Sequence, residues 1–137
     1  LAHTIGKEEL RIYSLDRIAD IEVLDTPLIL PENFDASDFF SDYFGIIIGH
    51  NIKASILELK ASAEQARYLE SLPLHSSQEV VETTPEYTIF RYRVVPTFDL
   101  KQEILSRGAT LEVLSPEWFR EEVVSEIKQM IKNYQLS

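Results

Sequence analysis

The sequence has no cysteine, and that absence excludes disulfide bonds and thiolate metal sites. Its four glycines stand alone at positions 6, 45, 49 and 108, which excludes a glycine-rich phosphate-binding loop. There is no Gly-x-Ser-x-Gly elbow to present a nucleophilic serine. The longest apolar run, Phe44–Gly49, is far shorter than the roughly 20 residues of a membrane-spanning helix, so we expect no membrane partner. Neither a secretory signal nor an initiator methionine is present, and we expect the chain to be part of a longer protein.

Basic residues are few, and the net charge of the 137 residues is −10. Residues 1–52 carry three basic against ten acidic side chains, whereas residues 53–137 carry ten against thirteen. An acidic surface repels phosphate backbones, so any contact with nucleic acid has to be local. The hydrophobic content of 45% is enough for a core, and the length predicts one domain or two small ones.

The first half of the chain is organised around a predicted strand, Leu10–Ile18, that follows a polar turn. The strand period of two places Arg11, Tyr13 and Arg17 on one face. Two arginines with a tyrosine between them are typical of a platform for a phosphate or a base, and a purely structural role stays open beside that reading. Further along, Asp35 is expected to cap a short helix with an aromatic face, and Phe34 to pack on Phe39.

The second half follows the order strand, helix, strand, strand, helix, strand. The expected strands are Ala54–Lys60, Gln78–Glu82, Tyr87–Val95 and Ala109–Leu114. A capping box at Ser62 opens the first helix, in which Ala66, Leu69 and Leu72 are expected to point inward, and Asp99 is expected to cap the second helix. This order predicts a ferredoxin-like α+β domain, with two helices on one face of a four-stranded antiparallel sheet.

A long terminal helix is predicted to start at Pro116. Its apolar residues recur at intervals of three and four, which indicates an amphipathic stripe that either closes the domain or pairs with a second subunit. The stripe consists of Phe119, Val123, Ile127, Met130 and Tyr134.

Arg91 and Arg93 alternate with the apolar residues of their strand, so we expect both on the sheet face opposite the core. Glu58, Lys60 and Glu112 are expected on the same face. One reading is a cross-strand ladder of opposite charges. The other is a face that binds an anion or contacts a second subunit.

No catalytic or metal site is expected. The three histidines, at positions 3, 50 and 75, are widely separated, whereas a zinc site needs three or four converging ligands. Most carboxylates lie on predicted solvated helix faces, and no pair can be assigned to a common cleft. We therefore expect a protein that is not an enzyme and needs no cofactor.

Five motifs, taken in order, resemble one family. Residues Arg11–Ile18 are similar to the R-x-F-R-L-D-R-I signature of WYL-domain proteins, which are mostly bacterial transcriptional regulators. The family's P-x-x-F-D, F-G-I, H-x-S-Q and G-x-x-v-x-V-l-x-P segments are similar to residues 30–35, 43–46, 74–78 and 108–116, in the same order and spacing.

The resemblance implies a domain organisation. Residues 1–52 would be the C-terminal part of a WYL domain, the remnant of an Sm-like β-barrel, and residues 53–137 the C-terminal extension called WCX. The winged helix-turn-helix that binds DNA in the family would be missing from this sequence. A regulator of this kind is expected in the cytoplasm.

The resemblance also implies a function, namely the ligand-sensing and oligomerising region of a transcriptional regulator. A nucleotide or other small anionic effector is expected to bind Arg11, Tyr13 and Arg17, with Arg91 and Arg93 as further candidates, and a homodimer is the expected assembly. Ser14 departs from the family pattern, in which arginine or lysine is usual at that position. The alternative is an interaction module that binds no ligand.

Overall fold

The computed structural model describes residues 2–4, 10–27, 29, 32–45 and 53–135. The chain divides into two compact units, Leu1–Ser41 and Asp42–Ser137. Asp42–Gly45 therefore group with the second unit. The predicted domain boundary after residue 52 falls at the edge of residues 46–52, which lie outside the described residues, and it stays a prediction.

The first unit contains little regular structure. Strands β1 (Ala2–His3) and β2 (Leu10–Arg11) pair antiparallel. The predicted strand Leu10–Ile18 is wrong beyond Arg11, because residues Leu15–Arg17 form the 3₁₀ helix η1. The Ser14 hydroxyl donates to the Asp16 carboxylate, and such a local bond offers the backbone an alternative to strand pairing.

Helix α1 (Ala36–Phe40) forms where the sequence predicts a short helix. Asp35 Oδ1 accepts hydrogen bonds from the amides of Ser37, at 2.6 Å, and Asp38, at 3.3 Å, which confirms the expected N-cap. The rings of Phe34 and Phe39 lie 5.8 Å apart, as the capping pattern predicts.

The second unit is a mixed α+β fold built on an open, four-stranded antiparallel sheet. Its strands are β3 (Ser55–Ser62), β4 (Glu79–Thr83), β5 (Tyr87–Val94) and β6 (Leu111–Ser115), in the spatial order β4-β5-β3-β6. The helices are α2 (Ala63–Ser71), α3 (Phe98–Ser106) and α4 (Glu117–Tyr134), with the 3₁₀ turn η2 (Gly108–Thr110) before β6. The predicted order of strands and helices is confirmed.

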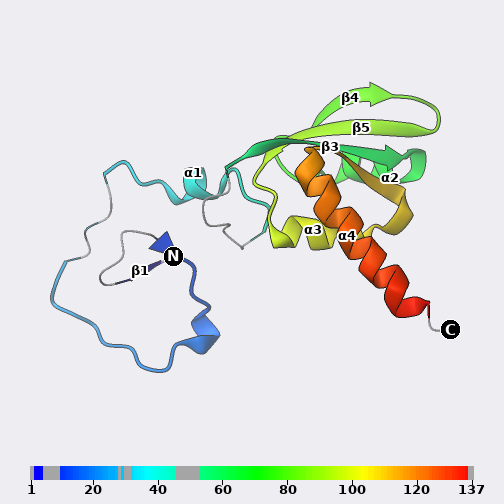
Figure 1. The fold of residues 1–137 in the computed structure, drawn as a ribbon. Coiled ribbons are helices and arrows are strands. Elements are labelled where there is room, and N and C mark those ends of the chain that lie inside the picture. The colour runs from blue at the N-terminus through cyan, green and yellow to red at the C-terminus, as the bar shows by residue number, and fades with distance from the viewer. Residues whose placement is uncertain (1, 5–9, 28, 30–31, 46–52, 136–137) are drawn as a thin grey trace. The chain divides into compact units, whose positions relative to one another are not determined.

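The core lies on the side of the sheet that the three helices cover (Figure 1). Strands β3 and β5 alternate between buried and more exposed residues, as a sheet with one covered face requires. Leu57 pairs with Tyr92 and Leu59 with Phe90, and all four side chains are buried. The helices and β6 complete the core with Ala66, Leu69, Leu100, Ile104, Leu111, Val113, Phe119 and Val123.

Strand β4 is an edge strand, and all five of its residues are exposed. Its pairing with β5 shifts register between Val80 and Glu82. The covering helices do not bury its valines, so β4 contributes backbone pairing to the sheet and little to the core.

Two details of the predicted helices are wrong. Leu72 was expected in the core but is 77% exposed, because it is the C-cap of α2 and its backbone has left the helical period. Thr97, and not Asp99, is the N-cap of α3, with the Leu100 amide donating to Thr97 Oγ1 at 3.5 Å. Asp99 instead lies in the first turn of α3, where its charge complements the helix dipole. The cap of α2 is confirmed, since the Gln65 amide donates to Ser62 Oγ at 3.2 Å.

Candidate functional site

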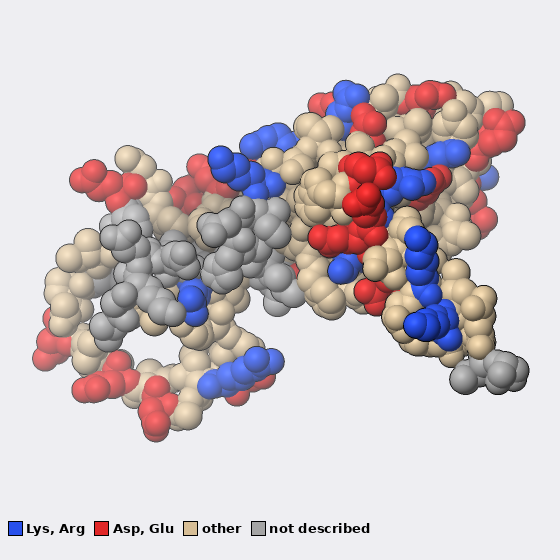
Figure 2. Space-filling model, in the orientation of Figure 1, with Lys and Arg blue, Asp and Glu red and all other residues tan. Residues whose placement is uncertain are grey.

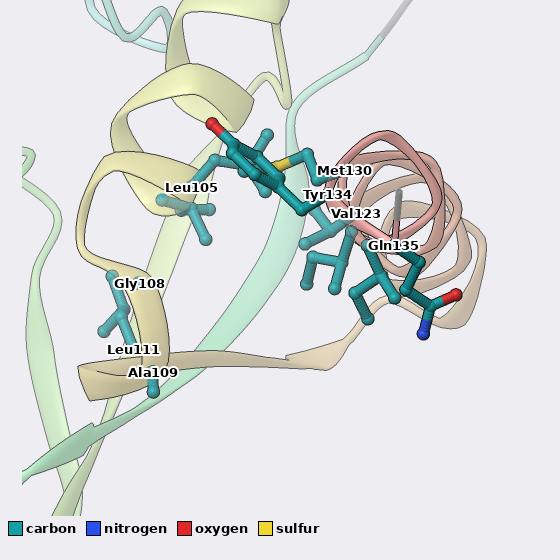
Figure 3. Close-up of a pocket in the computed structure, with 11 residues that line it drawn as sticks. Leu105, Gly108, Ala109, Leu111, Val123, Met130, Tyr134 and Gln135 are labelled. Carbon is teal, nitrogen blue, oxygen red and sulfur yellow. The ribbon is translucent and has the colours of Figure 1, made fainter. Parts of the chain in front are cut away.

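An apolar groove of about 580 Å³ lies between the C-terminal end of α3 and the second half of α4 (Figure 3). At the end of α4, Tyr134 contributes a phenol group and Gln135 an amide group to the lining of the groove. The other lining residues are Ile104, Leu105, Gly108, Ala109, Leu111, Val123, Ile127, Met130 and Ile131.

The groove exists because α4 is longer than the surface that it covers. At 1.5 Å per residue, its 18 residues span roughly 27 Å. Phe119 and Val123, in the first half, are buried, whereas Ile127 and Met130 are 42% and 44% exposed. The predicted apolar stripe is thus confirmed as a pattern, but only its first half enters the core.

Gly108 turns the chain at the wall of this groove. Its φ is +57°, a conformation that side-chain-bearing residues rarely adopt, and it follows Arg107, the C-cap of α3, so it comes after the last turn as the sequence predicts. The turn carries the chain from α3 through η2 into β6, so that Leu105 and Leu111 face the same groove.

The open face of the sheet carries Arg91. The Arg91 Nε and Nη2 atoms donate to Glu58 Oε1 at 3.1 and 2.8 Å, and the two residues are direct cross-strand partners. Lys60 on the same face lies 4.6 Å from the centre of the Tyr87 ring, and Glu112 pairs with Arg120 at 2.9 Å. The predicted ladder of opposite charges is confirmed for Glu58 and Arg91.

Arg93 has a partner that sequence reasoning missed. Its Nη1 lies 2.5 Å from Asp42 Oδ1, a residue 51 positions earlier in the chain. No local pattern indicates so distant a pair. Both arginines of the open face are therefore neutralised by carboxylates, and Figure 2 shows basic side chains interspersed with acidic ones on the visible face of this unit.

The three candidate ligand residues of the first unit lie in different local structures. Arg11 belongs to β2 and is half-buried, and its Nε atom has no hydrogen-bond partner among the described residues. The Tyr13 hydroxyl lies 2.6 Å from Thr4 Oγ1. Arg17 is exposed on η1, so the expectation that Arg11 and Arg17 share one strand face is wrong. Whether these residues bind a ligand stays a prediction.

The pKa values of two tyrosines in the second unit are raised by their surroundings. Burial raises the pKa of Tyr92, whose hydroxyl donates to Gln78 Oε1 at 2.8 Å. The hydrogen bond to Glu82, together with the charge of that carboxylate, raises the pKa of the half-buried Tyr87. Within the described part of the chain, no three histidine or carboxylate side chains gather as a metal site. No helix of that part is long and apolar enough to cross a membrane.

The sequence model of the WCX domain matches residues 56–131, more than half of the chain and the whole of the sheet apart from Ser55. The chain belongs to the WCX domain family. This agrees with the resemblance to WYL-type regulators, of which WCX is the C-terminal extension. A comparison with curated proteins found no match. The arginines of the open face and all groove-lining residues except Tyr134 and Gln135 lie within the matched region, and the pair Arg93–Asp42 joins it to a residue upstream.

Proposed function

We propose that the chain is the C-terminal region of a WYL-type transcriptional regulator, in which the WCX domain forms the contact between two subunits. The observation that carries the proposal is the apolar groove on a WCX domain. Ile127, Met130 and Ile131 line the groove while remaining 42–49% exposed, and burial of such a patch against a second copy is favourable.

The proposal includes the finer features of the fold. Counted along the chain, the four strands of the WCX domain lie in the order second, third, first, fourth, which supports a ferredoxin-like arrangement. Residues 1–52 would be the remnant of an Sm-like barrel, and DNA binding would belong to a helix-turn-helix outside this sequence. Such a regulator works in the cytoplasm and is not an enzyme.

In the proposed mechanism, an effector shifts a conformational equilibrium. A nucleotide or other small anion binds Arg11, Tyr13 and Arg17, and the bound state favours one packing of the WCX dimer over another. The effector acts only through its different affinity for the two states, so the arginines must be more accessible in one of them.

The subunit contact is tested by light scattering coupled to size exclusion at high protein concentration. We expect a dimer for the wild-type chain and a monomer for Ile127→Glu, because the substitution places a charge in the groove. Gln129→Glu, at an exposed position of α4 that does not line the groove, is the matched control and should stay a dimer. A monomeric wild-type chain, or equal effects of the two variants, would contradict the proposal.

A second candidate function is an interaction module that binds no ligand. It is favoured by the pairing of Arg91 with Glu58 and of Arg93 with Asp42, because paired arginines offer little charge to an anion. Thermal-shift measurements with mononucleotides, dinucleotides and short oligonucleotides separate the two candidates. A sensor is stabilised by one of these probes and loses the effect with Arg11→Ala or Arg17→Ala. A module responds to none of them.

A further inference from the structure

Residues Asp42–Gly45, which precede the WCX match, contact the segment that leads from β5 into α3. We infer that they form a latch that couples the preceding unit to the WCX groove through α3. The role of the groove as a regulated contact rests on the proposed function, which this latch would deepen. The latch itself rests only on the contacts described below.

The first point of attachment is at Asp42. Its carbonyl oxygen accepts a hydrogen bond from the Val95 amide at 2.6 Å, and Tyr43 forms a short parallel bridge with Val95. The Asp42 carboxylate also accepts a hydrogen bond from Arg93 Nη1 at 2.5 Å and forms an ion pair with it. The backbone and the side chain of one residue thus hold the latch to the end of β5.

The second point of attachment is at Phe44. Its side chain is half-buried and packs against the hydrophobic core of the WCX domain. Its carbonyl oxygen accepts a hydrogen bond from Thr97 Oγ1 at 3.3 Å. Thr97 is 96% buried and is the N-cap of α3, so the latch contacts the residue that starts this helix.

The third point of attachment is at Gly45, which has a φ of +74°. A β-carbon at this position would overlap the carboxylate group of Asp99 in the first turn of α3. Only glycine combines this backbone conformation with so close an approach. The docked latch therefore depends on a residue without a side chain.

Helix α3 connects the latch to the groove. Its N-cap Thr97 and Asp99 in its first turn contact the latch, and Ile104 and Leu105 in its last turn line the groove. A helix of nine residues spans roughly 13.5 Å, so it links the latch directly to the groove. At its other end the latch continues directly into Ser41, the C-cap of α1. A rearrangement of α1 that pulls on Asp42 would release α3 at its start and shift the groove wall at its end.

The sequence provides a single reporter for each end. Met130 is the only methionine, so labelling methionine methyl groups with ¹³C gives one NMR signal from the groove. The Val95 amide donates to Asp42, so its hydrogen exchange reports docking of the latch.

The test compares Gly45→Ala and Asp42→Ala with the wild-type chain. We expect Gly45→Ala to raise the exchange rate of the Val95 amide about tenfold or more, because a side chain at positive φ is strained, and to shift the Met130 methyl signal. Asp42→Ala removes only an ion pair that is partly exposed and should produce smaller changes in the same directions. Glu58→Ala, which breaks the ion pair with Arg91 on the open face without touching the latch, is the control and should leave both signals unchanged.

Slow exchange of core amides such as those of Leu59 and Tyr92 verifies that each variant stays folded. Spectra are compared at a concentration at which light scattering gives one oligomeric state for all variants, which separates failure of the latch from failure of the proposed dimer. Unchanged exchange at Val95 in Gly45→Ala would refute the latch. Faster exchange at Val95 with an unmoved Met130 signal would refute the coupling through α3.

Discussion

The two units of the chain use similar apolar residues with opposite results. In the WCX unit, leucines of β3 are fully buried, because β3 lies between β5 and β6 and helices cover one face. In the first unit, Leu15 is 85% exposed and Val23 is 92% exposed, and none of its described residues is buried. Apolar content alone does not form a core. Strands that pair across long stretches of sequence and a layer of helices are both needed.

The two units should differ most in the free energy of unfolding that each loses when a leucine is replaced with alanine. Leu59→Ala removes buried side-chain atoms from the centre of the sheet and should lower the free energy of unfolding by about 2–5 kcal/mol. Leu15→Ala, at an exposed position of η1, should change it by less than about 0.5 kcal/mol. Urea unfolding followed by fluorescence of Trp118, the only tryptophan, measures both. Equal losses would mean that Leu15 is buried in a core as Leu59 is, which would contradict its exposure.

A tyrosine in each unit extends the comparison to pH. Tyr92→Phe should lower the free energy of unfolding by about 1–2 kcal/mol at neutral pH, because the buried hydroxyl loses its bond to Gln78. Burial raises the pKa of Tyr92 from 10.0, so above pH 10 the unfolded chain releases this proton before the folded chain does. The stability that depends on the protonated phenol is complete below pH 10 and decreases as pH rises further.

The difference between wild type and Tyr92→Phe should therefore narrow above pH 10. Tyr13→Phe, in the first unit, breaks only the exposed contact with Thr4 and should unfold like the wild type at neutral pH. Urea titrations at pH 8 and above pH 10 provide the test. A difference between wild type and Tyr92→Phe that grows with pH would contradict the assigned role of burial.

Helix caps give the smallest expected effect. Ser62→Ala removes the acceptor for the Gln65 amide and should lower the free energy of unfolding by about 1 kcal/mol. Asp35→Ala removes the two amide contacts at the start of α1, but a helix of five residues outside the core should not alter the cooperative transition. If Asp35→Ala shifts the urea midpoint as much as Ser62→Ala does, α1 is part of the folded core.

Local signals in the sequence predicted much of this structure. The caps at Asp35 and Ser62, the order of strands and helices in the WCX unit, and the pairing of Glu58 with Arg91 all depend on residues close in sequence or on the two-residue strand period. The strand expected over Leu10–Ile18 failed for a local reason as well, since Ser14 bonds to Asp16.

The remaining features depend on the assembled fold. Asp42 meets Arg93 only because the chain returns to the corner of β5 after 51 residues. The apolar stripe of α4 was visible in the sequence, but the point at which burial stops depends on how far α3 and β6 extend beneath it. The groove lies where α4 is no longer packed against the core. A periodic pattern in the sequence does not show where along the helix that point falls.

The edge strand β4 has a consequence for concentrated solutions of this protein. An exposed edge is a template for sheet growth between molecules, and Val80 and Val81 would favour it. In an antiparallel pair of two such strands centred between these valines, Glu79 of one molecule would face Glu82 of the other. Like charges in that position oppose pairing, so the two glutamates would disfavour growth of the sheet from one molecule to another. Replacing both with threonine would remove this repulsion and leave pairing between the edges of two molecules less strongly opposed.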